Sequence, residues 1–240
     1  MADVKGALTA KSDSVADVDP RRGLDAYGER YRANPKDADA ALRYGLALRA
    51  NGQRAQAVAV LEQGSIAHPA NKAMLAAYGR ALADIGSFQQ AFDVLSRSHS
   101  PDNPDWRILS VQGAALDQMG RHDEARRYYA SALQIAPNEP AVLSNLGLSY
   151  VLSKDLPKAE ETLRQAQATG RADVRVRQNL ALAIGLQGRF AEAETIAKGD
   201  LPADEAAANV AYLKQMLARK DTPRTARNGK PPVVAFDQAD

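Results

Sequence analysis

The chain offers few side chains whose type and spacing could support metal binding or nucleophilic catalysis. It contains no cysteine, and its three histidines are His68, His99 and His122. Zinc sites use clustered thiolates and imidazoles, and a nucleophilic serine needs a base beside it. The histidines are 31 and 23 residues apart, and each lies close to an expected helix end, where an imidazole contacts backbone groups or water. We therefore predict no metal site.

The carboxylates and loops likewise show no catalytic arrangement. Glu160–Glu161 and the pair Glu192 and Glu194 fall in expected helices, where neighbouring acids are typical of solvated faces. No serine stands in a Gly-x-Ser-x-Gly turn, and no glycine-rich loop precedes Lys-Ser or Lys-Thr to cradle phosphates. We predict that the chain is not an enzyme and uses no cofactor.

Two asparagines have side chains that could take part in peptide binding. Asn145 and Asn179 are 34 residues apart. A side-chain amide supplies both a donor and an acceptor, so it pairs with a peptide unit regardless of the side chain that the peptide carries. One interpretation is therefore peptide contact, and the other is that the two amides cap or hydrate the surface on which they lie.

Overall charge and hydropathy exclude two classes of partner. The chain of 240 residues has 31 Lys and Arg against 29 Asp and Glu, a formal net charge of +2. Nucleic-acid-binding proteins usually concentrate a larger basic excess on one face. No apolar run approaches the ~20 residues of a membrane-spanning helix. We predict no nucleic-acid partner, and membrane association only through a lipid anchor that this chain lacks.

Small residues recur along the chain with a fixed period. The residues Gly45, Gly79, Gly113 and Gly147 are spaced by 34, and Ala181 takes the fifth place. Twelve residues after each of them comes an alanine: Ala57, Ala91, Ala125, Ala159 and Ala193. A shared period of this length indicates a stack of repeated structural units.

Each unit has the pattern of two helices joined by a turn. Apolar residues recur at helical spacing over about a dozen residues, then again after a glycine-containing turn. The two small residues allow the helices to cross closely. A later large residue is expected to fill the gap against the next repeat: Leu61, Leu95, Tyr129 or Leu163. Neither helix pair buries its apolar face alone, so the units are expected to stack into a solenoid.

This pattern resembles the tetratricopeptide repeat over residues 38–200. The resemblance implies an all-α, right-handed superhelical solenoid of about five helix-turn-helix repeats, with an N-terminal half repeat and a C-terminal capping helix. Residues 1–19 are predicted to be a disordered tether and residues 220–240 a disordered basic tail. Within the solenoid at 20–219, the expected units are a half repeat at 21–35, repeats at 38–71, 72–105, 106–139, 140–173 and 174–202, and a capping helix at 203–219.

Three residues depart from the repeat pattern. Lys154 replaces the glycine of the fourth turn, and Arg177 replaces an apolar residue at the fourth position of repeat five. Arg171 stands where a proline is expected to end the fourth repeat.

The resemblance implies that the first helix of each repeat lines a concave groove that binds a partner peptide. In related repeat proteins, stacked asparagines in this groove hold the backbone of an extended peptide, and Asn145 and Asn179 occupy the corresponding sixth position. The predicted groove residues are Leu42, Leu46, Arg49, Arg80, Arg107, Ser110, Asn145, Leu148, Arg175, Gln178 and Asn179.

One use of this groove is excluded by the residues present. Tetratricopeptide co-chaperones hold a peptide carboxylate with lysine, asparagine and arginine at set groove positions. Here those positions carry Leu42, Leu46, Ala77 and Val111, so that clamp is absent.

The C-terminal part, residues 176–217, is similar to the end of TadD-type proteins, the tetratricopeptide component of bacterial Flp/Tad pilus assembly systems. The runs Asp200-Leu-Pro and Glu205-Ala-Ala-Ala-Asn-Val-Ala-Tyr-Leu213 carry this similarity. It implies a periplasmic lipoprotein at the outer membrane whose partner is the pilus secretin or another assembly component. The alternative is a general cytoplasmic adaptor with an unrelated protein partner.

The two alternatives predict different locations. A lipoprotein of the TadD type has a leader and a lipid-carrying cysteine, and neither is present in this chain. If both were removed, the expected location is periplasmic; otherwise it is cytoplasmic.

Overall fold

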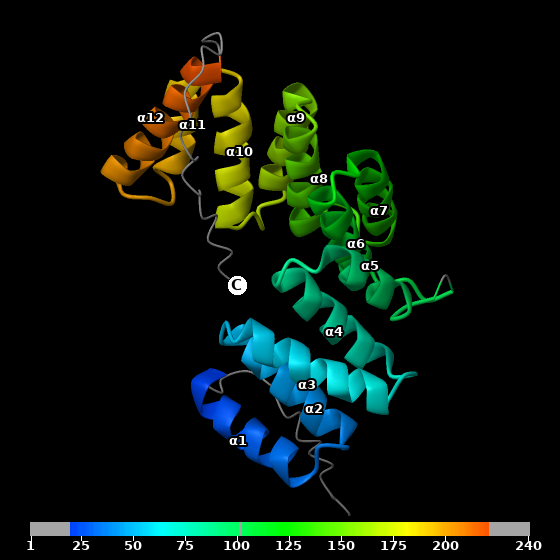
Figure 1. The fold of residues 1–240 in the computed structure, drawn as a ribbon. Helices are drawn as coiled ribbons and strands as arrows, with labels where there is room; N and C mark the ends of the chain where they lie inside the picture. Colours follow the sequence, from blue (N-terminus) through cyan, green and yellow to red (C-terminus); the bar gives the residue numbers. More distant parts are fainter. Residues whose placement is uncertain (1–19, 101, 221–240) are drawn as a thin grey trace, which may run out of the picture.

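Twelve α-helices follow one another along residues 20–100 and 102–220, the part of the chain that the computed structural model describes. Figure 1 shows them stacked into an arc. The predicted tether, and the predicted tail beyond residue 220, lie outside the described residues. The helices are α1 (Pro20–Ala33), α2 (Ala38–Ala50), α3 (Arg54–Ala67), α4 (Lys72–Asp84), α5 (Phe88–Ser96), α6 (Trp106–Gln118), α7 (His122–Ile135), α8 (Pro140–Leu152), α9 (Leu156–Ala168), α10 (Val174–Leu186), α11 (Phe190–Ala197) and α12 (Ala203–Lys220).

The first helix of each repeat begins after a capping residue that follows the same period as the glycines. Five side chains, 34 residues apart, accept a hydrogen bond from a backbone N–H in the first helical turn: Asp37, Asn71, Asp105, Glu139 and Asp173. Such a cap satisfies an N–H group that the helix leaves unpaired and typically contributes about 1 kcal/mol. The second helices α3, α5, α7 and α11 begin without a side-chain cap. Among the second helices only α9 has such a cap, where Asp155 accepts from the Lys158 N–H, so capping recurs regularly only at the start of each repeat.

The turn inside each repeat uses a residue with positive φ. Gly52, Gly86, Gly120 and Gly188 have φ between +72° and +84°. Lys154 takes the same place in the fourth repeat with φ of +63°. The turn geometry is thus retained without glycine, although a side chain at positive φ is sterically disfavoured.

A notch at each glycine receives a large side chain from the second helix of the same repeat. A Cβ atom on Gly45, Gly79 or Gly147 would lie 2.5 Å from the leucine sixteen residues later, and one on Gly113 would lie 2.6 Å from Tyr129. These large residues therefore fill the gap within their own repeat, and each also shares a buried cluster with an apolar residue of the next repeat, which confirms the prediction. Leu61, for example, shares its cluster with Met74 of the following repeat.

The order of helix contacts explains the arc. The backbones of the first helices α2, α4, α6, α8 and α10 approach one another closely in succession. In the described part, successive second helices meet only through side chains, such as the Phe92 and Tyr128 rings and the Arg164–Glu192 ion pair. First helices therefore lie on the inside of the curve, and we call the surface they form the inner face. At the C-terminal end, α12 contacts both α10 and α11, and Leu213 packs on Gly185. No helix of the described part is long and apolar enough to cross a membrane.

The two arginines that depart from the repeat pattern have partners elsewhere in the fold. Arg177 donates to both carboxylate oxygens of Asp200, with 2.7 Å between Nε and Oδ2, and to the Ala172 carbonyl at 3.0 Å. Only 6% of the Asp200 side chain is exposed, so this ion pair fixes the loop between α11 and α12. Arg171 donates to the Asn138 carbonyl in the previous inter-repeat loop at 3.3 Å.

Candidate peptide-binding groove

Two hydrogen bonds of the same kind link successive first helices on the inner face. Nδ2 of Asn145 donates to Ser110 Oγ, and Nδ2 of Asn179 donates to Ser144 Oγ, each with 3.0 Å between nitrogen and oxygen. Both serines are buried, and both asparagines are half-buried. We call these four residues the asparagine ladder.

The ladder leaves each side-chain amide with unused hydrogen-bonding capacity. Neither asparagine's side-chain oxygen has a hydrogen-bond partner among the described residues, and each amide nitrogen retains a second N–H. Ser110 itself, predicted as a groove residue, is only 6% exposed. Its hydroxyl holds Asn145 in place instead of meeting a ligand.

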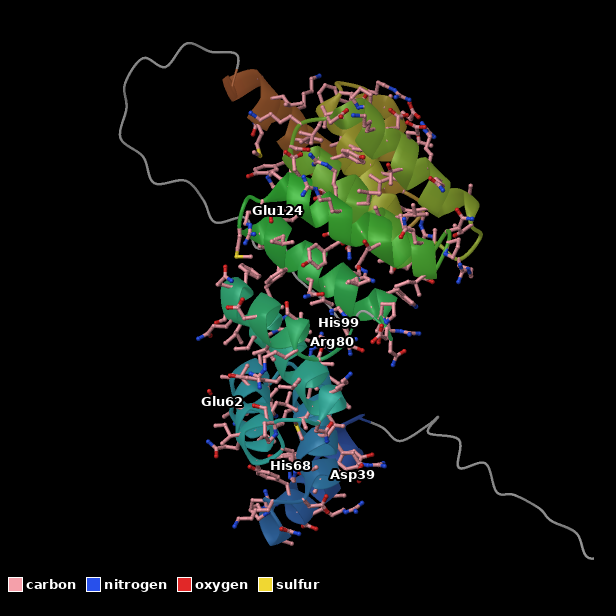
Figure 2. All side chains as sticks on the ribbon, turned by 90° about the vertical axis from the view of Figure 1, so that its right-hand side faces the viewer. Asp39, Glu62, His68, Arg80, His99 and Glu124 are labelled. Carbon is pink, nitrogen blue, oxygen red and sulfur yellow. The ribbon has the colours of Figure 1, made fainter. Side chains whose placement is uncertain are left out.

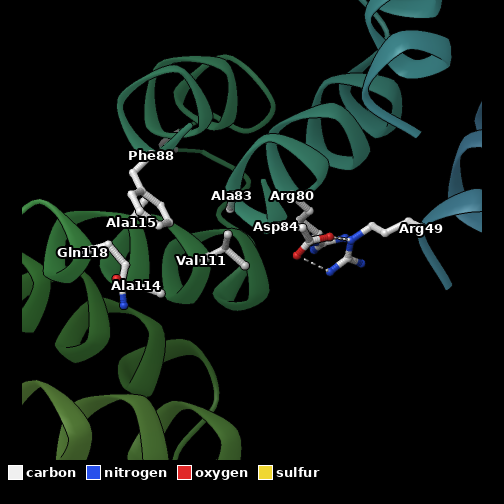
Figure 3. A pocket seen from close by; sticks show the side chains of 9 residues that line it. All are labelled: Arg49, Arg80, Ala83, Asp84, Phe88, Val111, Ala114, Ala115 and Gln118. Carbon is white, nitrogen blue, oxygen red and sulfur yellow. Dashed lines mark hydrogen bonds and ion pairs between the residues drawn. The ribbon is translucent and has the colours of Figure 1, made fainter. Parts of the chain in front are cut away.

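A cavity of about 180 Å³ lies between α2, α4 and α6. Arg49 donates to both carboxylate oxygens of Asp84, with 3.3 Å between Nη2 and Oδ1. Figure 3 shows these two residues and Arg80 at one end of the cavity, with Phe88 and Gln118 at the other. The lining residues are Arg49, Arg80, Ala83, Asp84, Phe88, Val111, Ala114, Ala115 and Gln118.

The electrostatic environment of Arg80 distinguishes it from the other arginines of the inner face. Arg80 is half-buried and makes no hydrogen bond or ion pair with the residues that the structure describes. Burial lowers the pKa of its guanidinium; Asp105 opposes this shift, and the positive charges of Arg49 and Arg107 add to it. The guanidinium nevertheless stays charged, because its ordinary pKa is above 12.

Other predicted groove residues are not gathered into either site. Arg107 lies 4.0 Å from Asp105, with its guanidinium carbon 4.5 Å from the centre of the Trp106 ring. Arg175 pairs with Asp173, the cap of its own helix, at 3.1 Å. The remaining predicted groove residues range from half-buried to exposed: Leu42, Leu46, Leu148 and Gln178.

The histidines lie apart, but not all of them contact backbone as predicted. Nε2 of His68 lies 2.7 Å from the Lys36 carbonyl oxygen, whereas Nε2 of His99 lies 3.1 Å from Oε1 of Gln112. Figure 2 shows His68 and His99 at different levels of the solenoid. No group of three or more His, Asp or Glu residues in the described part is placed to hold a metal ion.

Sequence reasoning missed a buried polar cluster around Asp117. Its carboxylate accepts hydrogen bonds from Tyr129 at 2.9 Å and from Ser149 at 2.8 Å, and Nδ1 of His122 lies 2.8 Å away. Burial raises the pKa of the Tyr129 hydroxyl, and the Asp117 charge adds to this effect. The sequence feature that could have indicated this cluster is Tyr129, which stands where three other repeats carry leucine. The cluster is used for packing between α6, α7 and α8.

Repeated helix pairs, an inner face of first helices and periodic glycine notches define a helical-repeat scaffold. Three family models, each described as a tetratricopeptide repeat, match residues 118–183, residues 45–104, and residues 106–128 together with 174–198. The chain is a tetratricopeptide repeat protein. Among curated proteins, a sequence comparison finds no match.

Solved structures share this fold at low sequence identity. PilW, a widely conserved type IV pilus biogenesis factor, is 17% identical with a TM-score of 0.69, covering 80% of this chain and 90% of its own. Cut9 in complex with Hcn1 is 16% identical with a TM-score of 0.66 over 82% of this chain, which spans 40% of that one. YrrB, a protein with an unusual peptide-binding site, is 12% identical with a TM-score of 0.53, covering 81% of this chain and 98% of its own.

Proposed function

We propose that this protein is a non-catalytic scaffold that holds an extended segment of a protein partner against its inner face. The main support for this proposal is the asparagine ladder. It presents two amides on successive repeats, each held by a buried serine and each with an unused acceptor and donor. An extended peptide offers a backbone unit about every 3.3 Å, so the two amides would meet different peptide units of one segment.

The more specific role that we propose is assembly of a Flp/Tad-type pilus or a related secretion system. The resemblance of residues 176–217 to TadD-type proteins supports this role, as does the shared fold with a type IV pilus biogenesis factor. The partner would be the secretin or another assembly component. We further propose a periplasmic location at the outer membrane, with attachment through a lipid anchor.

Site-specific crosslinking tests the groove and the partner together. A photo-crosslinking amino acid is placed at Gln178, which is exposed beside Asn179, in the product of the full-length native gene in its own host. The matched control carries the same group at Gln134, an exposed residue of the second helix α7. We expect position 178 to crosslink to an extended segment of a pilus-assembly protein, and Asn145→Ala/Asn179→Ala to reduce that product about tenfold.

The alternatives give different results. Crosslinks from position 134 but not from 178 would place the partner on the outer helices and contradict the groove. Crosslinks from position 178 to proteins unrelated to pilus assembly would leave the groove intact and favour the general adaptor. Fractionation of the same cells tests the location, because a cytoplasmic product would contradict the periplasmic proposal.

A further inference from the structure

The guanidinium of Arg80 is a charged group for which the described part of the chain supplies no acceptor. It is half-buried, and burial lowers its pKa. The nearby arginines Arg49 and Arg107 repel it, and the charge of Asp105 attracts it without forming an ion pair with it. A partly desolvated guanidinium without an acceptor is unfavourable, because its N–H groups lose water without gaining a partner.

The neighbouring carboxylate does not compensate Arg80. Both oxygens of Asp84 accept hydrogen bonds from Arg49, the other arginine that lines the cavity. The charged residues of the lining are therefore two arginines and one aspartate, a net charge of +1 at one end of the cavity. Charge complementarity favours an anionic group from outside.

The size and lining of the cavity indicate what kind of anion fits. A volume of about 180 Å³ is below the roughly 300–1,000 Å³ typical of small-molecule sites. Val111 adds an apolar surface next to the Arg80 end, and Ala114 lies beside the Gln118 amide at the far end (Figure 3). This combination suits one or two side chains of a polypeptide better than a free metabolite.

We propose that this cavity receives an acidic side chain, aspartate or glutamate, of the extended partner segment, with Arg80 as its ionic partner. The proposal rests on the proposed function and names a specificity determinant within it. A carboxylate accepts two parallel hydrogen bonds from a guanidinium, and this geometry selects for Asp or Glu over their amides. Apolar contact with Val111 favours a small apolar residue next to the acid.

Peptide selection on the full chain tests this proposal. Random dodecapeptides displayed on phage are selected on the wild-type protein, on Arg80→Gln and on Arg127→Gln, the control in which an exposed arginine of the outer helix α7 is changed. Selected peptides are synthesised with the acid and with its amide. We expect wild type and Arg127→Gln to bind the acidic form about tenfold or more tightly than the amide form, and Arg80→Gln to bind both equally.

Three results would overturn the proposal, and they separate it from the proposed function. Selected peptides without a preferred acid, or an unchanged preference in Arg80→Gln, contradict the Arg80 site alone. Failure of all three proteins to select any peptide contradicts groove binding itself. Thermal unfolding checks that the variant is folded: Arg80→Gln should unfold at or above the wild-type temperature, because it removes a charge for which the described residues supply no acceptor.

Discussion

The side-chain amide of Asn145 on α8 donates a hydrogen bond to the hydroxyl of Ser110 on α6, across the junction between two repeats. The same bond recurs one repeat later between Asn179 and Ser144. Each serine is buried, so it restrains an amide that is itself within reach of solvent. The inner face is thereby preorganised at two consecutive positions.

Removing the serines tests this preorganisation without deleting the amides. We expect Ser110→Ala/Ser144→Ala to weaken binding of a groove-selected peptide by about fivefold or more, because each of the two freed amides must be immobilised on binding at about 0.5–1.5 kcal/mol. Fluorescence anisotropy with a labelled peptide measures this. Ser131→Ala, on the outer helix α7, is the control and should bind as wild type. Unchanged affinity in the double variant would show that the serines do not matter for binding.

The buried ion pair at the C-terminal end predicts a local loss of stability. Arg177→Met leaves the Asp200 carboxylate, of which only 6% is exposed, without its ionic partner, and this destabilises the loop that the pair holds. Hydrogen exchange should therefore accelerate in α12 but not in α2 to α4. Arg175→Met, which removes an exposed pair, should change exchange little. Equal protection of α12 in wild type and Arg177→Met would contradict this role.

The glycine notch predicts that alanine is too large in the middle of a helix. Gly147→Ala places a Cβ atom 2.5 Å from Cγ of Leu163, and overpacking of this kind costs about 1–3 kcal/mol. The gain of about 1 kcal/mol in helix propensity offsets part of that cost. Urea denaturation should show a net loss of up to about 2 kcal/mol. With Leu163→Ala added, the total loss should be smaller than the sum of the two single changes.

The positive φ of Lys154 predicts that replacing this residue with glycine stabilises the protein. Its φ of +63° is sterically disfavoured for a residue with a Cβ atom, so Lys154→Gly should raise the free energy of unfolding by about 0.5–1 kcal/mol after the greater freedom of glycine in the unfolded chain is included. Lys154→Ala separates this effect from the loss of charge and should stay within about 0.5 kcal/mol of wild type. A less stable glycine variant would refute the explanation.

The lowered pKa of Glu160 predicts that the stability of the protein depends on pH. Burial opposes its ionisation, but hydrogen bonds from Arg189, Gln187 and Arg164 outweigh burial and lower its pKa from 4.5 to about 2. Because the folded-state pKa is the lower one, this stabilisation is present above pH 4.5 and is lost as the pH falls toward 2.

Solvent screening of the partly exposed arginines reduces the effect to about 1–2 kcal/mol. Denaturation at pH 7 and pH 3 should therefore show a smaller loss of stability in Glu160→Gln than in wild type. Glu161→Gln, exposed on the same helix, is the control. A loss in Glu160→Gln as large as in wild type would count against the network.

The fold was predictable because its signals are local and repeated. The period of 34, the glycines and the helical spacing of apolar residues each act within one repeat, and the structure confirms an all-α solenoid. The capping residues at Asp37 and its equivalents follow the same period, so the helix starts that they mark could also have been predicted from the sequence. The asparagines were predicted as a spaced pair, but their hydrogen bonds to Ser110 and Ser144 were not.

The interactions between successive repeats were decided only by the tertiary structure. The sequence by itself determined that helices pair, turn at glycine and stack, since these follow from steric and helical preferences of nearby residues. The partner of Arg177, the bonds of Asn145 and Asn179, and the lack of a described partner for Arg80 depend on how successive repeats are oriented. That orientation comes from packing between whole helices, so residues 23 to 35 positions apart meet only after the stack has formed.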